Sequence, residues 1–255
     1  MASRHLTPLA FLGAFLALLP AAAAGSPTVA DLLRAYPQEL ARIDGNDLVW
    51  RDGARMPISD GIGGKSFETL LDHPDIDDMF VIPYRPGPSA GPPGHDEDPG
   101  RIRYEPFFIK MYGDCQKGEV AQHLTSVAWL SGTVRFTSTN GAAEHLAAAV
   151  ADLKKLPATF TRYLLPSAGT YNCRAIAGTD RRSMHAYGAA IDISTRYSDY
   201  WLWAKPDAAG IPYRDRIPFE IVDIFERHGF IWGGKWYHYD TMHFEYRPEL
   251  LPAAH

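Results

Sequence analysis

The chain is poor in cysteine, in excess basic charge and in long apolar runs. Its two cysteines, Cys115 and Cys173, have no Cys or His neighbour at ligand spacing, which argues against a cysteine-based zinc site. The formal net charge of −5 argues against nucleic acid and anionic lipid surfaces as partners. Beyond residue 24 no stretch reaches the roughly 20 apolar residues of a membrane-spanning helix. Internal repeats are absent as well.

Residues 1–24 have the pattern of a secretory signal peptide. Arg4 supplies a basic start, residues 9–19 are apolar, and residues 22–24 are small, as cleavage requires. An uncleaved anchor is the alternative, but the apolar run is short for a span. We therefore expect an exported protein, periplasmic or extracellular at the cell wall, with no stable membrane span after cleavage. Cleavage of the signal peptide would remove Arg4 and so change the formal net charge from −5 to −6.

The two cysteines form an even pair in a chain that we expect to be exported, which predicts a Cys115–Cys173 disulfide. Two reduced, buried thiols are the alternative.

Two short segments concentrate imidazoles and carboxylates. The first is Ser183-Met-His-Ala-Tyr-Gly-Ala-Ala-Ile-Asp192, and the second is Asp240-Thr-Met-His243. A hydrolytic zinc site uses three N or O protein ligands and leaves one position open. We assign His185, Asp192 and His243 as the Zn²⁺ ligands. Asp240 is then the general base that takes a proton from the attacking water.

The local pattern around Asp192 supports this assignment. Residues 189–194 are predicted to form a short buried strand, with Ile191 and Ile193 on one face and Asp192 on the other. An ionised Asp in such a strand is costly unless a cation or hydrogen-bond donors meet it. Gly188 lies where the chain must turn to aim both side chains at one point. Taken singly, a buried His is more often a core residue and an Asp more often a cap, so the joint pattern carries the assignment.

The joint pattern resembles a family of zinc metallopeptidases that cut bacterial peptidoglycan. Ser183, His185, Gly188, Ala190 and Asp192 complete the first motif. The second motif, Asp-x-x-His-Phe-Glu, spans residues 240–245, and Trp-Gly-Gly-x-Trp precedes it at residues 232–236. The family comprises D-alanyl-D-alanine carboxypeptidases and L-alanyl-D-glutamate endopeptidases, and it shares its fold with the hedgehog signalling domain. The resemblance covers roughly residues 125–250.

The resemblance implies a Zn²⁺-dependent hydrolase that acts on the peptidoglycan stem peptide. The D,D-carboxypeptidases of this family usually carry Glu-x-x-His at the second motif, whereas the endopeptidases carry Asp-x-x-His, as here. We therefore expect an L-alanyl-D-glutamate-type endopeptidase, with D-alanyl-D-alanine carboxypeptidase as the alternative. A non-catalytic zinc-containing cell-wall-binding module and a metallohydrolase of other peptides are the remaining alternatives. We expect a monomer.

Three further residues are candidates for roles around the metal. Arg174 precedes the first motif, and the family uses an upstream Arg to stabilise the oxyanion or to orient the substrate. A plain ion pair is the alternative for Arg174, and Arg181 and Arg182 are rivals that we expect to be solvated. Ser183 is expected to orient a ligand by a hydrogen bond from outside the coordination sphere. His238 is an alternative ligand or a transition-state donor.

The remaining pattern predicts an α+β fold with a mainly antiparallel sheet, as the hedgehog and D,D-peptidase-like zinc core would require. Residues 25–125 are expected to form an N-terminal extension packed on a catalytic domain of residues 126–255. Asn140 is predicted to cap a helix that Pro157 stops, and Pro218 to open a second helix that ends at Gly229. Further predicted elements are helices near residues 28–36 and 66–71, a hairpin over 48–58, an exposed loop at 86–100, and strands at 132–137, 169–176, 230–232 and 242–246.

Overall fold

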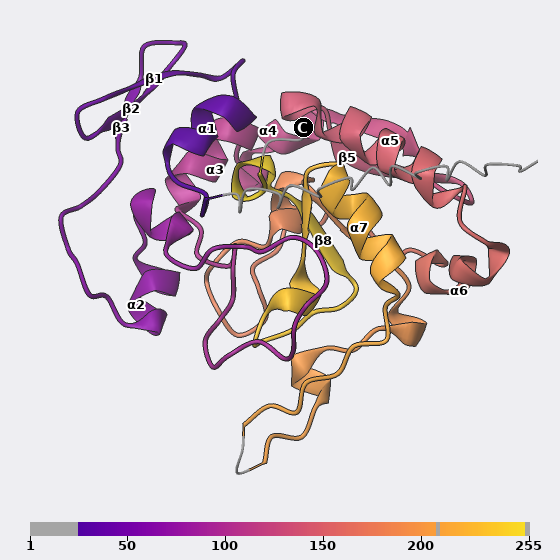
Figure 1. Ribbon diagram of the computed structural model, residues 1–255. Coiled ribbons are helices and arrows are strands. Elements are labelled where there is room, and N and C mark those ends of the chain that lie inside the picture. The colour runs from indigo at the N-terminus through magenta and orange to yellow at the C-terminus, as the bar shows by residue number, and fades with distance from the viewer. Residues whose placement is uncertain (1–24, 208–209, 253–255) are drawn as a thin grey trace, which may run out of the picture.

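The computed structural model describes residues 25–207 and 210–252 (Figure 1). The predicted signal peptide lies outside these residues. The helices are α1 (Ala30–Ala35), α2 (Phe67–Asp72), α3 (Glu105–Tyr112), α4 (Glu119–Gln122), α5 (Ala142–Leu153), α6 (Thr161–Leu164) and α7 (Phe219–Arg227). The strands are β1 (Leu40–Asp44), β2 (Asp47–Trp50), β3 (Arg55–Pro57), β4 (Leu124–Ala128), β5 (Thr133–Thr137), β6 (Ala190–Asp192), β7 (Phe230–Trp232) and β8 (His243–Tyr246).

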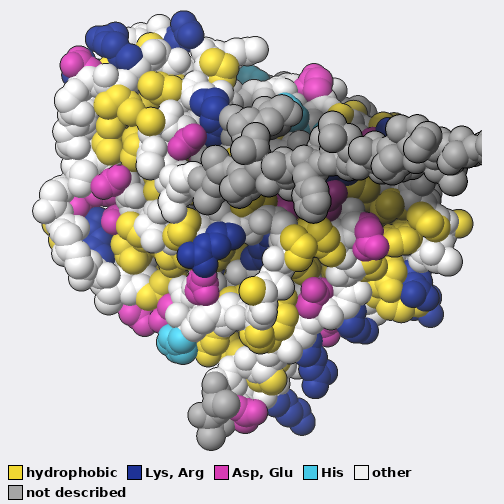
Figure 2. Space-filling model, viewed as in Figure 1, with side chains coloured by type: hydrophobic (Ala, Val, Ile, Leu, Met, Phe, Trp, Pro, Cys, Tyr) yellow, Lys and Arg dark blue, Asp and Glu magenta, His cyan; other side chains and the backbone are white. Residues whose placement is uncertain are grey.

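The strands form small antiparallel sheets. The β1-β2-β3 sheet contains the predicted hairpin, β4 pairs with β5, and β6-β8-β7 forms the third sheet. The predicted α+β class with antiparallel sheets is thereby confirmed. Within the described part of the chain, every helix is too short or too polar to cross a membrane. Figure 2 shows acidic and basic side chains distributed together over the viewed face.

The β6-β8-β7 sheet separates a buried apolar face from a polar one. Side chains alternate along a strand, so Ile191 and Phe244 enter the largest hydrophobic cluster. Helices α5 and α7, which lie beside each other in Figure 1, contribute Leu146, Val150, Val222 and Phe225 to that cluster. The opposite face of the same strands carries Asp192, His243 and Glu245. Burial of the apolar face thus fixes the register that places these polar residues together.

A second hydrophobic cluster joins the N-terminal region to the first motif. Leu32, Trp50, Phe107 and Phe108 pack in it with Met184, Tyr187, Ala189 and Ala190. The Tyr187 ring lies 5.8 Å from Phe108 and 6.0 Å from Tyr112, between ring centroids, and both partners belong to α3. The turn that carries His185 is therefore held by residues from both halves of the chain.

Polar contacts join the same two halves. Tyr36 donates to the buried Glu249 at 2.6 Å, and Tyr84 donates to Glu226 at 2.6 Å. Lys235 forms a buried ion pair with Glu226 at 2.6 Å. The predicted disulfide is also present, between Cys115 and Cys173. It ties the turn after α3 to the segment that precedes the first motif.

Three local predictions were wrong. Residues 169–176 form isolated bridges, Gly169 to Asp192 and Ala175 to Arg182, instead of a strand. The carbonyl of Thr170 accepts a hydrogen bond from the His185 ring, so it does not serve a strand ladder.

Asn140 does not cap α5. Its backbone is left-handed at φ 55°, its Nδ2 lies 2.9 Å from the Met111 sulfur, and Gly141 precedes the helix.

Arg182 is not solvated. It pairs with Asp114 at 2.8 Å and with Glu105 at 3.1 Å, and its side chain is largely buried.

Candidate metal centre

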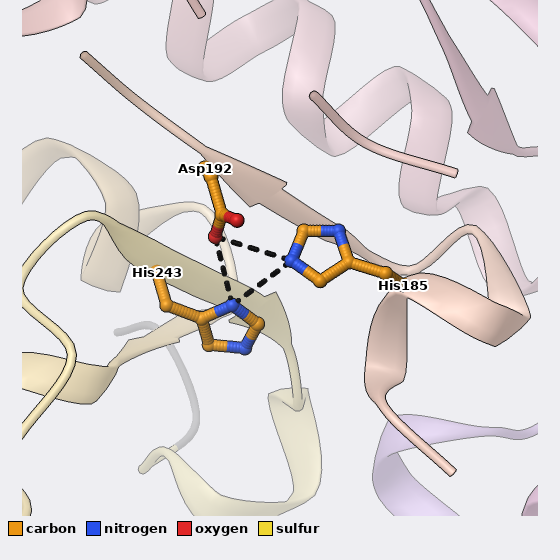
Figure 3. Close-up of side chains that lie close together, drawn as sticks. All are labelled: His185, Asp192 and His243. Atoms are coloured by element: carbon orange, nitrogen blue, oxygen red, sulfur yellow. Dashed lines mark hydrogen bonds and ion pairs between the residues drawn. The ribbon is translucent and has the colours of Figure 1, made fainter. Parts of the chain in front are cut away.

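Three side chains converge on one point from β6, β8 and the turn before β6 (Figure 3). His185 Nε2 lies 3.2 Å from His243 Nδ1 and 3.1 Å from Asp192 Oδ1, and the last two atoms are 3.0 Å apart. Ligands of a tetrahedral zinc at 2.0–2.1 Å would be separated by about 3.3 Å. The three atoms thus stand within a few tenths of an ångström of a zinc coordination triangle.

The strand register explains how Asp192 and His243 meet. They are directly paired residues of β6 and β8, and the side chains of such a pair lie on the same face of the sheet, close together. Glu245, two residues after His243, lies on that face as well. Two of the candidate ligands are therefore positioned by the sheet itself.

His185 is positioned by a tight turn. It belongs to the 3-10 turn η5 (Met184–Tyr187), which Ser183 begins by accepting a hydrogen bond from the His185 backbone nitrogen at 3.3 Å. Ser183 thus orients His185 through the backbone. Gly188 ends the turn at φ +65°, and a Cβ there would collide with Leu124. Only glycine fits both requirements.

Each imidazole is oriented by a hydrogen bond from its other nitrogen. His185 Nδ1 donates to the carbonyl of Thr170, and His243 Nε2 donates to Glu245 Oε2 at 3.0 Å. Since a carbonyl and a carboxylate can only accept, the inward nitrogens are left with free lone pairs. This arrangement of outer partners is typical of metal-ligating histidines. The donor set and its orientation fit zinc.

The electrostatics of the cluster favour positive charge at its centre. Burial alone would raise the pKa of the Asp192 carboxyl, but hydrogen bonds with His185 and His243 hold that pKa well below its usual range. Burial would lower the pKa of His243, yet the hydrogen bonds to Asp192 and Glu245 raise it to about 10. Both directions arise from attraction between these carboxylates and imidazoles, and the carboxylates provide the negative charge that a bound cation would need.

Asp240 lies beside this cluster and outside it. It lines the same small cleft as His185 and His243, but among the described residues the group of converging ligand atoms comprises only His185, Asp192 and His243. Its Oδ1 is buried and has no hydrogen-bond partner within the described ranges. Burial, followed by the charge of Asp192, raises the pKa of Asp240 to about 6.

The Trp-Gly-Gly-x-Trp segment holds Asp240 in place. The Gly233 carbonyl accepts a hydrogen bond from the Asp240 backbone nitrogen at 2.9 Å. A Cβ at Gly233 would lie 2.6 Å from the Asp240 carbonyl oxygen. Trp232 Nε1 donates to the carbonyl of Thr241 at 2.9 Å. The segment therefore anchors the loop that precedes β8.

Arg174 and His238 both line the cleft. Arg174 is exposed, and within the described residues its guanidinium donates to the neighbouring Ala175 carbonyl, at 3.3 Å. His238 does not join the group of converging ligand atoms. Its Nδ1 faces Asp98 Oδ2 at 2.7 Å.

Sequence reasoning missed the supporting charges. Glu245 ends the second motif, and the motif alone does not predict its surroundings: it is fully buried and contacts His243, Arg103 at 2.5 Å and Arg247 at 3.1 Å. Burial alone would raise the pKa of Glu245, but the Arg103 charge and the His243 hydrogen bond hold it well below its usual range. Asp98 and Arg103 lie in or after the predicted loop, and no local pattern singled them out.

The comparisons with known proteins agree with this geometry. Residues 177–246 match the family model described as D-alanyl-D-alanine carboxypeptidase. No curated protein and no solved structure matches the chain. The matched segment contains His185, Asp192, Asp240 and His243 and excludes Arg174. The resemblance predicted from the two motifs is therefore confirmed by the match of residues 177–246 to this family of zinc metallopeptidases.

Proposed function

We propose that this protein is an exported, zinc-dependent peptidoglycan peptidase that hydrolyses a bond in the stem peptide. The observation that carries the proposal is the triangle of ligand atoms at 3.0–3.2 Å, with Asp240 beside it. His185, Asp192 and His243 would hold the metal. We further propose an L-alanyl-D-glutamate-type endopeptidase, because the second motif begins with Asp240. D-alanyl-D-alanine cleavage is the competing reaction within the same family.

When bound, zinc supplies a Lewis acid that polarises the scissile carbonyl and makes water more acidic. Asp240 would accept the proton of the attacking water and pass it to the leaving amine. Its unpartnered Oδ1 supports this role, because a carboxylate held for structure alone would be hydrogen-bonded. The same oxygen argues against a purely structural zinc module.

Arg174 is the proposed donor to the developing oxyanion. It lines the cleft with His185 and Asp240, and its guanidinium is not committed to a carboxylate within the described residues. An uncommitted guanidinium can turn toward negative charge that appears only during the reaction.

Export and domain organisation remain part of the proposal. The signal peptide is proposed for residues 1–24 on sequence alone. Residues 25–125 are proposed as an extension that packs on the catalytic segment 126–255. The hydrophobic cluster shared by Leu32, Phe107, Met184 and Tyr187 supports that packing.

The test is digestion of purified sacculi followed by mass identification of the released fragments. Zinc-loaded protein should release fragments, and chelator should stop the reaction. His185→Ala and His243→Ala should lose zinc by elemental analysis and lose activity, while Arg42→Gln on β1 should behave like wild type. New amino termini at D-glutamate would identify the endopeptidase, and free D-alanine the carboxypeptidase. No fragment from the zinc-loaded protein would refute the proposal.

A further inference from the structure

A larger groove opens from the metal cleft. Its volume is about 1140 Å³, and it shares Arg101, Arg103 and Ile176 with the cleft that holds His185 and Asp240. One wall comes from the N-terminal region, including Pro57, Leu71, His73 and Tyr104. The other comes from the segment before the first motif, including Gly178, Thr179 and Arg181.

Four of the described arginines line this groove. Arg182 is paired with Glu105 and Asp114, and we call the other three, Arg101, Arg103 and Arg181, the arginine cluster. The side chains of Arg101 and Arg103 are only 11% and 10% exposed, and that of Arg181 is 24% exposed. Long cationic side chains are seldom buried to this extent unless their donors are satisfied.

The donors of the arginine cluster are only partly satisfied. Arg101 pairs with Asp98 at 2.7 Å and Arg103 with Glu245 at 2.5 Å, each through one terminal nitrogen. Arg181 has a single, longer ion pair, 3.6 Å from Asp72. The Nε atoms of Arg103 and Arg181 are buried, with no hydrogen-bond partner in the described part of the chain. The ion pairs of the cluster therefore leave some of its guanidinium donors unused.

Charge repulsion among the guanidinium groups also favours the binding of an anion. Burial lowers the pKa of both Arg103 and Arg181. The carboxylates of Glu245 and Asp72 oppose this shift, and the charge of Arg101 adds to it. An anion placed among the three guanidinium groups would relieve this repulsion.

Among the described acidic residues of the groove, Asp72 alone forms an ion pair with the arginine cluster, at 3.6 Å from Arg181. Asp60 and Asp75 face Lys65, at 2.7 and 3.7 Å, and Glu105 pairs with Arg182. Asp72 and Asp180 are exposed.

We propose that the arginine cluster binds a carboxylate of the peptide substrate at a residue away from the scissile bond. The inference rests on the proposed function and names its substrate class, an acidic peptide of several residues. The groove volume exceeds the range of about 300–1,000 Å³ typical of small-ligand pockets, so it accommodates more than a dipeptide. Planar guanidinium groups suit carboxylates because they can donate two parallel hydrogen bonds.

The experiment measures binding without turnover. Zinc-loaded Asp240→Asn protein is titrated calorimetrically with L-alanyl-γ-D-glutamyl-L-lysyl-D-alanine. The same peptide is then used with its glutamyl α-carboxyl, or its C-terminal carboxyl, converted to a carboxamide. At least one amidation should weaken binding roughly ten- to hundredfold, the usual loss for a hydrogen-bonded charge. The responsive carboxyl identifies the group that the cluster binds.

The Arg181→Gln and Arg101→Gln changes, each in the Asp240→Asn background, should remove most of the discrimination between carboxylate and carboxamide. Arg181 makes only the 3.6 Å pair, and Asp98 keeps its contacts with His238 when Arg101 is replaced, so both variants should fold. Arg42→Gln, an exposed arginine on β1, is the matched control and should keep full discrimination.

Equal affinity for all three peptides, absence of measurable binding, or discrimination unchanged in both arginine variants would overturn the proposal. If the protein digests sacculi but binds the amidated and unamidated peptides with equal affinity, this inference is refuted and the proposed reaction is not. If the protein binds the amidated peptides more weakly but releases no fragment from sacculi, the proposed reaction is refuted and this inference is not.

Discussion

The ring of His238 is held against a carboxylate that has no exposed surface, with Nδ1 2.7 Å from Asp98 Oδ2. The backbone nitrogen of His238 donates to the other oxygen of the same carboxylate at 3.0 Å. Burial alone would raise the pKa of Asp98, but the His238 hydrogen bond and the Arg101 charge hold it below its usual range. Asp98 is therefore an ionised partner that fixes the ring at the edge of the metal cleft.

We expect His238→Ala to lower kcat roughly 10²–10³-fold, the usual cost of losing one transition-state donor, while zinc content stays the same. Asp98→Asn should have a smaller effect in the same direction, because the ring remains but loses its anionic partner. Steady-state kinetics with elemental analysis tests both, and His123→Ala, an exposed histidine, is the control. Loss of zinc in His238→Ala would make His238 a ligand, and wild-type kcat would remove it from the reaction.

Glu245 should matter for the metal and for the fold together. It accepts from His243 Nε2 and neutralises the buried Arg103 and Arg247. Glu245→Gln should weaken zinc binding about 10- to 100-fold through the outer hydrogen bond. It should also lower the free energy of unfolding by about 3–5 kcal/mol, because the buried Arg103 guanidinium loses its counter-charge and Arg247 keeps only Glu249. Chelator competition and thermal unfolding measure the two effects, and the exposed Glu144→Gln is the control. If Glu245→Gln bound zinc with wild-type affinity, Glu245 would have no role in metal binding.

Ionisation of Asp240 should make kcat/KM fall at acidic pH, and we call this fall the acidic limb of the pH profile. A base acts when ionised, so activity rises with pH through its pKa, which burial and Asp192 raise to about 6. A bound cation favours the ionised form, so in the zinc-loaded enzyme the limb should lie at or below about pH 6. Asp240→Asn should retain zinc, lose the limb and lower kcat roughly 10²–10⁴-fold. An unchanged limb in the variant would assign the ionisation to another group.

The Cys115–Cys173 disulfide closes a loop of 58 residues. Its reduction, or Cys115→Ser, should lower the free energy of unfolding by about 4 kcal/mol on the chain-entropy estimate. Turnover should fall as well, because Cys173 fixes the segment that carries Arg174, while zinc content should not change. Thermal unfolding, kinetics and elemental analysis separate these effects. If stability fell but kcat did not change, the disulfide would have a structural role only and would not position Arg174 for catalysis.

The three ligands could be predicted from sequence because each motif is readable in a short window and the two motifs together resemble a known family, although His243 lies 51 residues from Asp192. The alternation around Asp192 and the left-handed turn at Gly188 are both readable in a short window. Asp98 and Arg103 could not be predicted in the same way. Their partners, His238 and Glu245, lie about 140 residues away in the chain, and a contact of this kind follows from tertiary packing.

The wrong local predictions have the same origin. Residues 169–176 have a plausible strand composition, but the Thr170 carbonyl is used by His185. Asn140 is a common capping residue, yet its side chain turns to Met111 and Gly141 takes the position before α5. In both cases a contact made by the folded chain outweighed a local preference.

Tyr187 packs against Phe108 and Tyr112 of α3, which contributes no candidate ligand. We therefore expect metal occupancy to affect the local unfolding of α3. A ligand that binds only the folded state adds a stabilisation that grows with the logarithm of its concentration, about 4 kcal/mol at a thousand times its Kd. Because Tyr187 follows His185 in the same turn, part of that stabilisation reaches the N-terminal half. Amide hydrogen exchange in α3 should therefore accelerate when zinc is chelated, so that the N-terminal half of the protein reports the state of a centre that lies in the C-terminal half.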